Sequence, residues 1–398
     1  MMQTSRSQLS LILARMPTNE EGKKRTGQRL WLQWPGWFLW SSGIALLGLE
    51  LIARVWVAWY WPAEKVFQLT HHTENRGRFT SHPILGYMLK PNFHSGRFSH
   101  NSYGFRGPSF SIEKPPRTLR IVLMGASTVY GVAVSDEETS AVQLENRLHT
   151  LLPGRRVEVL NAGVPGWNSR ETLINLRLRV LTLHPNIVVI VDGRNEVFPQ
   201  LFNNYQEDYS HYRKVGYQFR NSNYTYKLLF RVSHLFMLVA TSGRGRLGFS
   251  QREENPAYGS IRYENLPTDE ELLQNARDYR RTETFRRNLE QEIQLTNEQG
   301  GRVILSTIPF YPKGYSSDVL RGNRQTLPVI SNWVVGNNEI TRMVARKWGV
   351  ALVDANTTLS RPEFLVDDCH FNPTGEQAFA DLILDAIKSI LATHQTFF

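Results

Sequence analysis

The apolar residues of this chain form one long run near the start and several short runs after residue 117. The long run extends from Trp37 to Trp61, with FLWSSGIALLGLELIARVWVAWYW after the leading tryptophan. It is long enough to cross a bilayer with some tilt. Tryptophans lie toward both of its ends, as in the aromatic belts of spanning helices. The pattern therefore predicts a transmembrane helix.

Two charged residues, Glu50 and Arg54, interrupt the long run. Each would cost about 2.5 to 3.5 kcal/mol at mid-bilayer on the insertion scale. Because the acid precedes the base by four residues, the two can pair on one face of a helix, and Arg54 can also extend toward the outer interface. A cleaved signal peptide is an alternative, favoured by the short charge-free core from Trp37 to Leu49, but no A-x-A-like cleavage site follows. A core helix of a soluble protein is a second alternative, against which the density of tryptophans argues.

The short apolar runs are rich in valine and isoleucine and show little alternation. They are RIVLM (120–124), VEVLN (157–161), IVVIV (187–191), RVILS (302–306) and VALV (350–353). Such runs suit strands of a parallel sheet that is covered on both faces. Stretches with helical periodicity separate or follow them, at 140–152, 170–183, 277–298, 337–348 and 373–392. This alternation predicts a three-layer α/β/α sandwich around a doubly wound, five-stranded parallel sheet.

Two segments do not fit the alternation. Residues 62–116 are rich in Gly, His, Phe and Asn without a sustained period, so we expect an irregular linker wrapped on the domain. Residues 198–279 are too long for a simple connection, so we expect an insertion, either a lid or a substrate-binding subdomain, between the two parts of the sandwich, 117–197 and 280–395. Its apolar stretch 228–240 is too short to span a membrane. We expect a lid there, or a helix that rests on the bilayer or on the domain.

The charge of the chain is unevenly distributed. A net charge of +10 would by itself suggest an anionic partner such as nucleic acid or lipid. Part of the excess precedes Pro35, where the charged residues are Arg6, Arg15, Glu20, Glu21, Lys23, Lys24, Arg25 and Arg29. A basic block directly before an apolar run is typical of a topology signal and not of a nucleic-acid site. We therefore expect a cytoplasmic tail over 1–35, a signal anchor over 36–61, and an extracytoplasmic remainder.

The composition also limits the chemistry. The single cysteine, Cys369, excludes an intramolecular disulfide framework and a zinc knuckle, and we expect it to pack in the interior. Five histidines before the first predicted strand have neither a fixed ligand spacing nor a carboxylate partner, so no metal is expected there. They are His71, His72, His82, His94 and His100. Neither a dinucleotide fingerprint nor a phosphate loop occurs, and no cofactor is expected.

Reactive side chains follow the predicted strands. Ser127 follows the first strand in the segment GAST (125–128), where glycine permits a tight turn and the serine begins a helix. NAGVPGWNS (161–169) follows the second strand and DGRNE (192–196) the third. DDCH (367–370) lies beyond the fifth strand and precedes an Asn-Pro helix start. Because ligands bind outside the carboxyl ends of the strands in a doubly wound sheet, we expect these four segments to form one site.

These four segments resemble the four blocks that define the SGNH (GDSL) hydrolases, in the same order. G-A-S-T resembles the G-D-S-L block, N-A-G-V-P-G the glycine block, G-R-N-E the G-x-N-D block and D-D-C-H the D-x-x-H block. The resemblance covers about residues 117–391 outside the insertion, and the upstream GYMLKPN and NSYGFRG resemble segments of membrane-associated bacterial members. Two departures concern the support of the site: Ala126 and Glu196 each replace an aspartate of the family pattern.

The resemblance implies a flavodoxin-like fold and a serine esterase mechanism. Ser127 would attack an ester carbonyl after His370 removes its proton, and Asp367 would hold the imidazole in the required tautomer. The rival histidines His184 and His149 fall before the third strand and on a helix, respectively.

The resemblance also implies an oxyanion hole. Its donors would be the backbone N–H groups of Ser127 and Gly166 and the side-chain amide of Asn195. Gly163 lies in the same block as Gly166, and alignment on the block's initial asparagine favours Gly166.

The expected activity is that of an extracytoplasmic esterase that cleaves an acetyl or other O-acyl ester through an acyl-enzyme. One alternative is an O-acyltransferase acting on a surface or secreted polysaccharide, since water and a sugar hydroxyl differ only as the second nucleophile. An alternative of another class is a membrane-anchored binding or assembly protein on an inactive SGNH fold, against which the five filled roles argue. The oligomeric state is not predicted.

Aromatic residues of the insertion, interleaved with Asn and Arg, could form a sugar platform, although such loops more often pack on their own domain. They are Tyr205, Tyr209, Tyr212, Tyr217, Phe219, Tyr224 and Tyr226.

Overall fold

The computed structural model describes residues 34–60, 77–214, 232–242, 260–314, 320 and 325–393. All five short apolar runs are strands of one sheet, which confirms the predicted fold. The strands are β3 (Thr118–Gly125), β4 (Arg156–Asn161), β5 (Ile187–Val191), β6 (Arg302–Ser306) and β7 (Ala351–Val353). Their order is β4-β3-β5-β6-β7, and every neighbouring pair is parallel. This is the flavodoxin-like order, in which the strand order reverses between β3 and β5.

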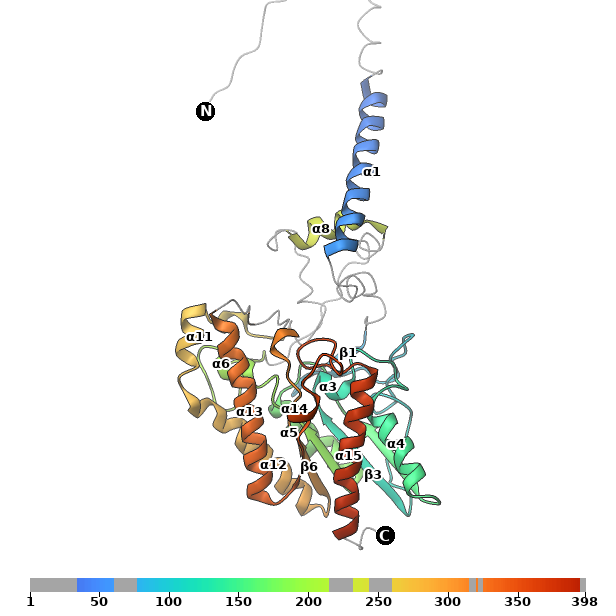
Figure 1. The fold of residues 1–398 in the computed structure, drawn as a ribbon, viewed down its shortest axis with the longest axis vertical. Helices are drawn as coiled ribbons and strands as arrows, with labels where there is room; N and C mark the ends of the chain where they lie inside the picture. Colours follow the sequence, from blue (N-terminus) through green and yellow to red (C-terminus); the bar gives the residue numbers. More distant parts are fainter. Residues whose placement is uncertain are drawn as a thin grey trace, which may run out of the picture.

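Helices cover both faces of the sheet (Figure 1). The side chains of α4 (Ser140–Leu151) and α15 (Pro373–Thr393) pack on one face, together with the short α3 (Ser127–Tyr130) and α14 (Ala355–Leu359). The other face is covered by α5 (Ser169–Asn175), α12 (Glu283–Glu298) and α13 (Thr326–Trp348).

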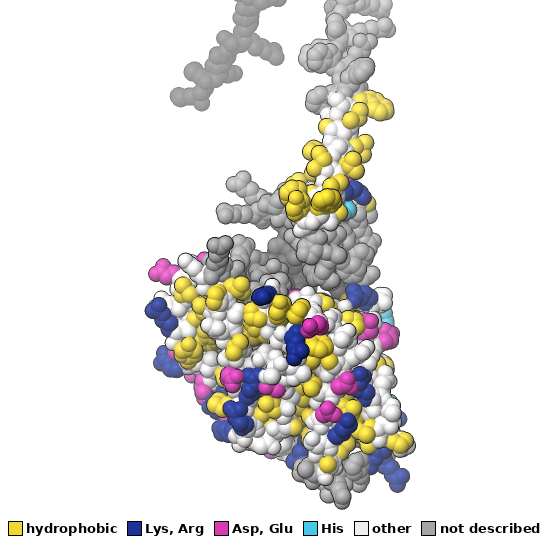
Figure 2. Space-filling model, viewed as in Figure 1, with side chains coloured by type: hydrophobic (Ala, Val, Ile, Leu, Met, Phe, Trp, Pro, Cys, Tyr) yellow, Lys and Arg dark blue, Asp and Glu magenta, His cyan; other side chains and the backbone are white. Residues whose placement is uncertain are grey.

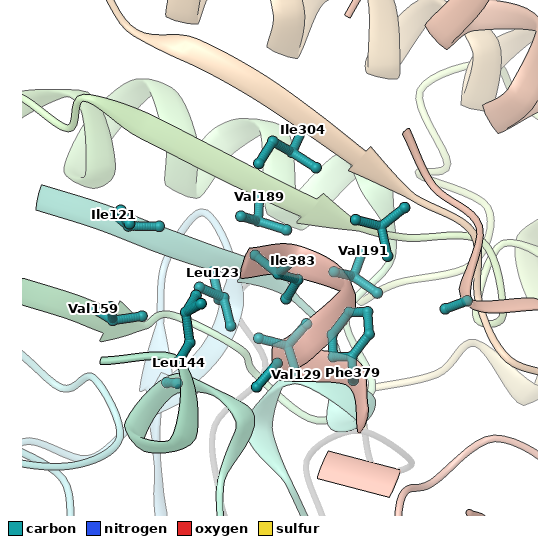
Figure 3. Close-up of a cluster of buried hydrophobic side chains, with 14 of the residues drawn as sticks. Ile121, Leu123, Val129, Leu144, Val159, Val189, Val191, Ile304, Phe379 and Ile383 are labelled. Carbon is teal, nitrogen blue, oxygen red and sulfur yellow. The ribbon is translucent and has the colours of Figure 1, made fainter. Parts of the chain in front are cut away.

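Each strand supplies both layers of the core because successive side chains point to opposite faces. Ile121 and Leu123 of β3 point toward Leu144 and Ile383 of the first helical layer, as Figure 3 shows. Val122 of β3 belongs to the cluster on the opposite face. All five side chains are fully buried. The lack of alternation in the strand sequences follows from this two-sided burial.

Several elements differ from the sequence expectation. The segment before β3, expected to be irregular, contains an antiparallel hairpin, β1 (Phe79–His82) and β2 (Gly86–Leu89). The α13 helix begins at residue 326 instead of 337, since Pro328 falls in the first turn, where proline is tolerated. The helix expected from residue 277 begins at 283, after a 3₁₀ turn over Tyr279–Thr282. After α5 the chain continues as a π-helical turn, Leu176–Val180, and a 3₁₀ turn, Leu181–Leu183.

The segment before β3 packs closely on the nucleophile helix. Arg106 is buried, donates hydrogen bonds to the carbonyl groups of Tyr130, Gly131 and Val134 at the end of α3, and pairs with Asp136 at 2.8 Å. These bonds satisfy carbonyl groups at the C-terminal end of α3.

Two histidines of the same segment have structural roles. The ring of His100 lies between the Lys90 carbonyl and the Tyr130 hydroxyl, both at 3.0 Å. His82 Nδ1 accepts the backbone N–H of Leu85 at 3.1 Å. The positions of His71 and His72 lie outside the described residues.

The predicted anchor is a helix, α1 (Trp34–Tyr60). Its segment Trp40–Tyr60 is long and apolar enough to cross a membrane, and only 11% of its most apolar window is buried. A core helix of a soluble domain would be mostly buried, so this exposure argues against that alternative. Arg54 Nε lies 2.9 Å from Glu50 Oε1, which confirms the expected pair.

The described parts of the insertion contain α6 (Val197–Leu201), α8 (His234–Ser242), a 3₁₀ turn over Tyr263–Asn265 and α11 (Asp269–Asn275). Tyr209 and Tyr212 are buried, and the Tyr205 hydroxyl is hydrogen-bonded to the Arg281 carbonyl at 3.1 Å. These tyrosines pack on their own domain and offer no sugar platform. The platform residues 217, 219, 224 and 226 lie outside the described residues.

Candidate active site

Three of the predicted catalytic side chains form a continuous hydrogen-bonded chain. Ser127 Oγ lies 2.7 Å from His370 Nε2, and His370 Nδ1 lies 2.6 Å from Asp367 Oδ2. When Nδ1 donates to the carboxylate, Nε2 is free to accept the serine proton. The arrangement is that of a nucleophile, a base and a group that orients the base.

Two glycines allow Ser127 to occupy this position. Gly125, the last residue of β3, has a φ of +151°, and a Cβ there would lie 2.4 Å from the Val191 carbonyl oxygen of β5. A Cβ on Gly163 would lie 2.5 Å from the backbone nitrogen of Tyr130. Only glycine therefore permits this approach of β5 and of the 161–169 segment to the nucleophile turn. Ser127 emerges next to the point where the strand order reverses, between β3 and β5.

The loop that carries His370 is held by polar contacts. Asp367 Oδ1 accepts the backbone N–H groups of Cys369 and His370, at 3.0 and 2.9 Å. The adjacent Asp368 forms an ion pair of 2.8 Å with Arg194, and both side chains are buried. Since Arg194 belongs to the G-R-N-E segment, this ion pair joins the loop of the base to the loop of Asn195.

The electrostatics of the triad favour a charged imidazole. Burial opposes the charge on His370, but the neighbouring Cys369 thiol and the hydrogen-bonded Asp367 carboxylate together outweigh burial and raise the pKa of His370 well above its usual value. Burial acts against the charge on Asp367 as well, yet the imidazole and two backbone N–H groups lower the pKa of Asp367 to about 2. Burial raises the pKa of the Cys369 thiol, which agrees with a packing role. Asp367 can thus stabilise the imidazolium that forms when Ser127 loses its proton.

The hydrogen bonds of the predicted oxyanion-hole residues show which of their donors are already engaged. Within the described residues, the N–H groups of Ser127 and Gly166 donate no hydrogen bond, whereas the N–H of Gly163 donates to Asn161 Oδ1 at 3.1 Å. Of these two glycines of the block, only Gly166 therefore has an N–H that is not engaged in a hydrogen bond within the described residues. Asn195 Nδ2 donates one of its two hydrogens to the Trp167 carbonyl at 2.7 Å. The other hydrogen remains for a ligand.

The carbonyl groups of residues 165, 166 and 167 each accept a hydrogen bond from a side chain of a different segment. Tyr87 Oη of the β1–β2 hairpin donates to the Pro165 carbonyl at 2.8 Å. Arg213 of the insertion donates to the Gly166 carbonyl, and Asn195 holds the Trp167 carbonyl. In a planar trans peptide the N–H points opposite to the C=O, so Tyr87 fixes the direction of the Gly166 N–H.

Tyr87 and Arg213 are absent from the residues proposed from the sequence. Tyr87 lies in GYMLKPN, where the family resemblance was the available signal. Arg213 lies in the insertion, where nothing in the sequence marks it.

Two of these donor residues, Ser127 and Asn195, line a small cavity. Its lining includes Ser127, Trp167, Asp192, Arg194 and Asn195, and its volume is about 10 Å³. Asp367, Cys369 and His370 also bring together atoms that could bind a metal. Both ring nitrogens of His370 are already hydrogen-bonded, and the buried thiol is neutral, so this set does not suit an ion.

The rival histidines lie elsewhere. His184 has a φ of +51° and ends the 3₁₀ turn before β5, at the opposite edge of the sheet. His149 is exposed in the last turn of α4.

No family model and no curated protein matches the chain. Among solved structures, it is similar to a lipase/acylhydrolase from Enterococcus faecalis, with 20% identity over 68% of this chain and 95% of that chain and a TM-score of 0.39. It is also similar to an acetylxylan esterase from Geobacillus stearothermophilus, with 15% identity over 67% and 93% of the two chains and a TM-score of 0.38. A third similar structure is an α/β hydrolase from the metagenome of Lake Arreo, Spain, with 16% identity over 68% and 94% and a TM-score of 0.40.

The strand order and the four blocks at one edge of the sheet are features of this chain itself. The chain has the SGNH hydrolase fold.

The structure shows the surroundings of Ala126 and Glu196, the two residues that replace aspartates of the SGNH pattern. Ala126 precedes α3 without a side-chain cap and lines the cavity. The Glu196 carboxyl accepts the Ser169 N–H and hydroxyl and the Tyr209 hydroxyl, the last at 2.9 Å. Glu196 therefore joins the Asn195 segment to α5 and to the insertion.

Glu196 is one of several buried acids under the site. Burial, with a smaller contribution from Asp192, raises the pKa of Glu196 to about 8, and burial raises that of Asp192 to about 7. The pKa of Glu292 is raised well above its usual value, again chiefly by burial. Burial thus favours the neutral form of all three carboxyls, which reduces the negative charge that they place near a developing oxyanion.

Proposed function

We propose that this chain is a membrane-anchored serine esterase that hydrolyses a short O-acyl ester through an acyl-enzyme. The observation that carries the proposal is the Ser127–His370–Asp367 hydrogen-bonded chain at the switch point of the sheet. The unengaged N–H groups of Ser127 and Gly166 and the amide of Asn195 support it, because an acyl-transfer site needs donors where negative charge develops.

In the first half of the reaction, Ser127 Oγ forms a bond to the acyl carbon while its proton passes to His370 Nε2. The tetrahedral oxyanion is met by the two N–H groups and the Asn195 amide, each donor being worth about 2.7 to 4 kcal/mol of transition-state stabilisation. The carbonyl forms again, the bond to the alcohol oxygen breaks, and His370 returns the proton to that oxygen. Water then attacks the acyl-enzyme with His370 as base, which releases the acid and restores Ser127.

The cavity supports a short acyl group. A volume of about 10 Å³ is roughly that of one water-sized probe, which accommodates an acetyl methyl group better than a long chain.

The sequence at the N-terminus supports the proposed location. Basic residues precede α1, so the positive-inside rule favours a cytoplasmic N-terminus and a catalytic domain on the outer side.

The test is turnover of p-nitrophenyl esters of increasing acyl length by the purified full chain, with and without a sugar acceptor. We expect acetate to be the best substrate and Ser127→Ala to be inactive. Formation of an acylated sugar at the expense of free acid would assign the chain to acyl transfer. A folded wild-type chain that turns over no ester and takes no serine-directed label would instead be a binding or assembly protein.

A further inference from the structure

The insertion contacts the membrane helix at one acidic residue. The Glu50 carboxylate of α1 accepts the backbone N–H groups of His234 and Leu235, at 2.8 and 2.9 Å, and the Ser233 hydroxyl at 2.8 Å. On the same turn of α1, Arg54 donates to the Val232 carbonyl at 3.0 Å. Glu50 thus accepts hydrogen bonds from backbone N–H groups at the start of α8, which have no partner within the helix. Arg54 donates to a carbonyl group just before the helix.

The depth of this contact is unusual. Glu50 precedes Tyr60, the end of the Trp40–Tyr60 span, by ten positions. At 1.5 Å per residue this places it roughly 15 Å from that end, which is about the half-thickness of a hydrocarbon core. The start of α8 lies beside a residue that would be deep in the bilayer.

In hydrocarbon the two partners satisfy each other. An isolated carboxylate is costly there, and so are unpaired backbone N–H groups at a helix start. In the structure the backbone N–H groups at the start of α8 donate to the Glu50 carboxylate, so neither the carboxylate nor these N–H groups are left without a partner. This accounts for a charged pair within an otherwise apolar helix.

The surface of α8 (HLFMLVATS) is also suited to lipid. Met237 of α8 is buried, while Val239 of α8 exposes 51% of its surface and Val232, two residues before the helix, exposes 54%. Figure 1 shows α8 crossing α1 toward the end that faces the α/β sandwich, and Figure 2 shows hydrophobic side chains gathered on these two helices. Because α1 itself exposes large apolar side chains such as Leu47, the apolar surface continues from one helix to the other.

We propose that residues 232–242 enter the outer half of the bilayer against α1, with lipid acyl chains covering the exposed face of α8. Glu50 is the residue that fixes this segment. The catalytic domain is then tied to the membrane through its insertion as well as through the anchor, which limits its distance from the lipid surface. This inference rests on the proposed anchor but not on the esterase activity.

The experiment uses the full chain in phosphatidylcholine vesicles whose acyl chains carry bromine, a contact quencher. An environment-sensitive fluorophore is attached to Val239→Cys, to Leu47→Cys on α1 as the positive control, or to Leu151→Cys on α4 as the negative control. The native Cys369 is buried. Wild-type protein treated with the same fluorophore checks that this cysteine does not react.

We expect strong quenching at positions 47 and 239 and none at 151. Quenching at 47 without quenching at 239 would overturn the inference and leave the anchor intact. Absence of quenching at both positions would refute the anchor as well. Glu50→Ala in the Val239→Cys chain should lower quenching at 239, while Glu50→Gln, which keeps one acceptor oxygen, should retain most of it. Unchanged quenching in Glu50→Ala would contradict the role given to Glu50.

Discussion

Tyr87→Phe removes one hydroxyl and keeps the ring, so it tests whether the hairpin before β3 supports catalysis. The Tyr87 side chain is fully buried, and its hydroxyl donates to the Pro165 carbonyl at 2.8 Å. The substitution leaves that carbonyl without a donor and frees the peptide whose other end is the Gly166 N–H. A change at the oxyanion hole is therefore expected, without a change at Ser127 or His370.

The magnitude follows from two contributions. Leaving a buried acceptor unpaired costs about 1 to 3 kcal/mol, which should appear as lost stability. If the peptide rotates, part of the roughly 2.7 to 4 kcal/mol that an oxyanion donor supplies is lost in the transition state. Since about 1.4 kcal/mol corresponds to a tenfold change in rate, kcat should fall by roughly 10- to 100-fold with little change in KM.

The assay is steady-state hydrolysis of p-nitrophenyl acetate, with thermal unfolding measured in parallel. Tyr103→Phe is the matched control, because the Tyr103 hydroxyl also donates to a backbone carbonyl, that of Arg179 at 3.1 Å, but does not contact the 165–167 segment. We expect Tyr103→Phe to lose stability and keep kcat. A wild-type kcat in Tyr87→Phe, or an equal loss of kcat in both variants, would show that the Tyr87 hydroxyl does not support the oxyanion hole.

Three further predictions concern the site. The neutral form of His370 is the base and its pKa is raised, so kcat/KM should rise with pH through a pKa above 6.5; Asp367→Asn should lower both this pKa and the rate, and an unshifted profile would count against the pairing. Glu196 has a folded-state pKa of about 8 against 4.5 in the unfolded chain, so it binds more protons when folded and should reduce the free energy of unfolding as pH rises from about 4.5 to 8. Glu196→Gln should flatten that decline in unfolding scans, and an equally steep decline would exclude Glu196 as its source. Asn195→Ala should lower kcat by roughly 10² to 10³ and still allow slow labelling of Ser127 by a fluorophosphonate, and wild-type turnover would remove Asn195 from the oxyanion hole.

The sheet could be predicted from the sequence because burial on both faces leaves continuous apolar runs, as in IVVIV of β5. Ser127 and Asn195 closely follow β3 and β5, so the local sequence indicated them as well, whereas Asp367 and His370 lie beyond α14 and were indicated by the resemblance of DDCH to the D-x-x-H block. Tyr87 and Arg213 could not be found in this way, since their contacts with the 165–166 peptides join segments far apart in the chain. The contact of Glu50 with α8 is of the same kind. The sequence suggested the Glu50–Arg54 pair, but not that a helix start from the insertion completes it.

The central claim is that Ser127 is the nucleophile, and intact-mass analysis after treatment with a serine-directed fluorophosphonate tests it most directly. Wild type should gain one adduct that maps to Ser127, and folded Ser127→Ala should gain none and turn over no ester. An adduct on another active-site serine, or ester turnover by the folded Ser127→Ala chain, would contradict the account.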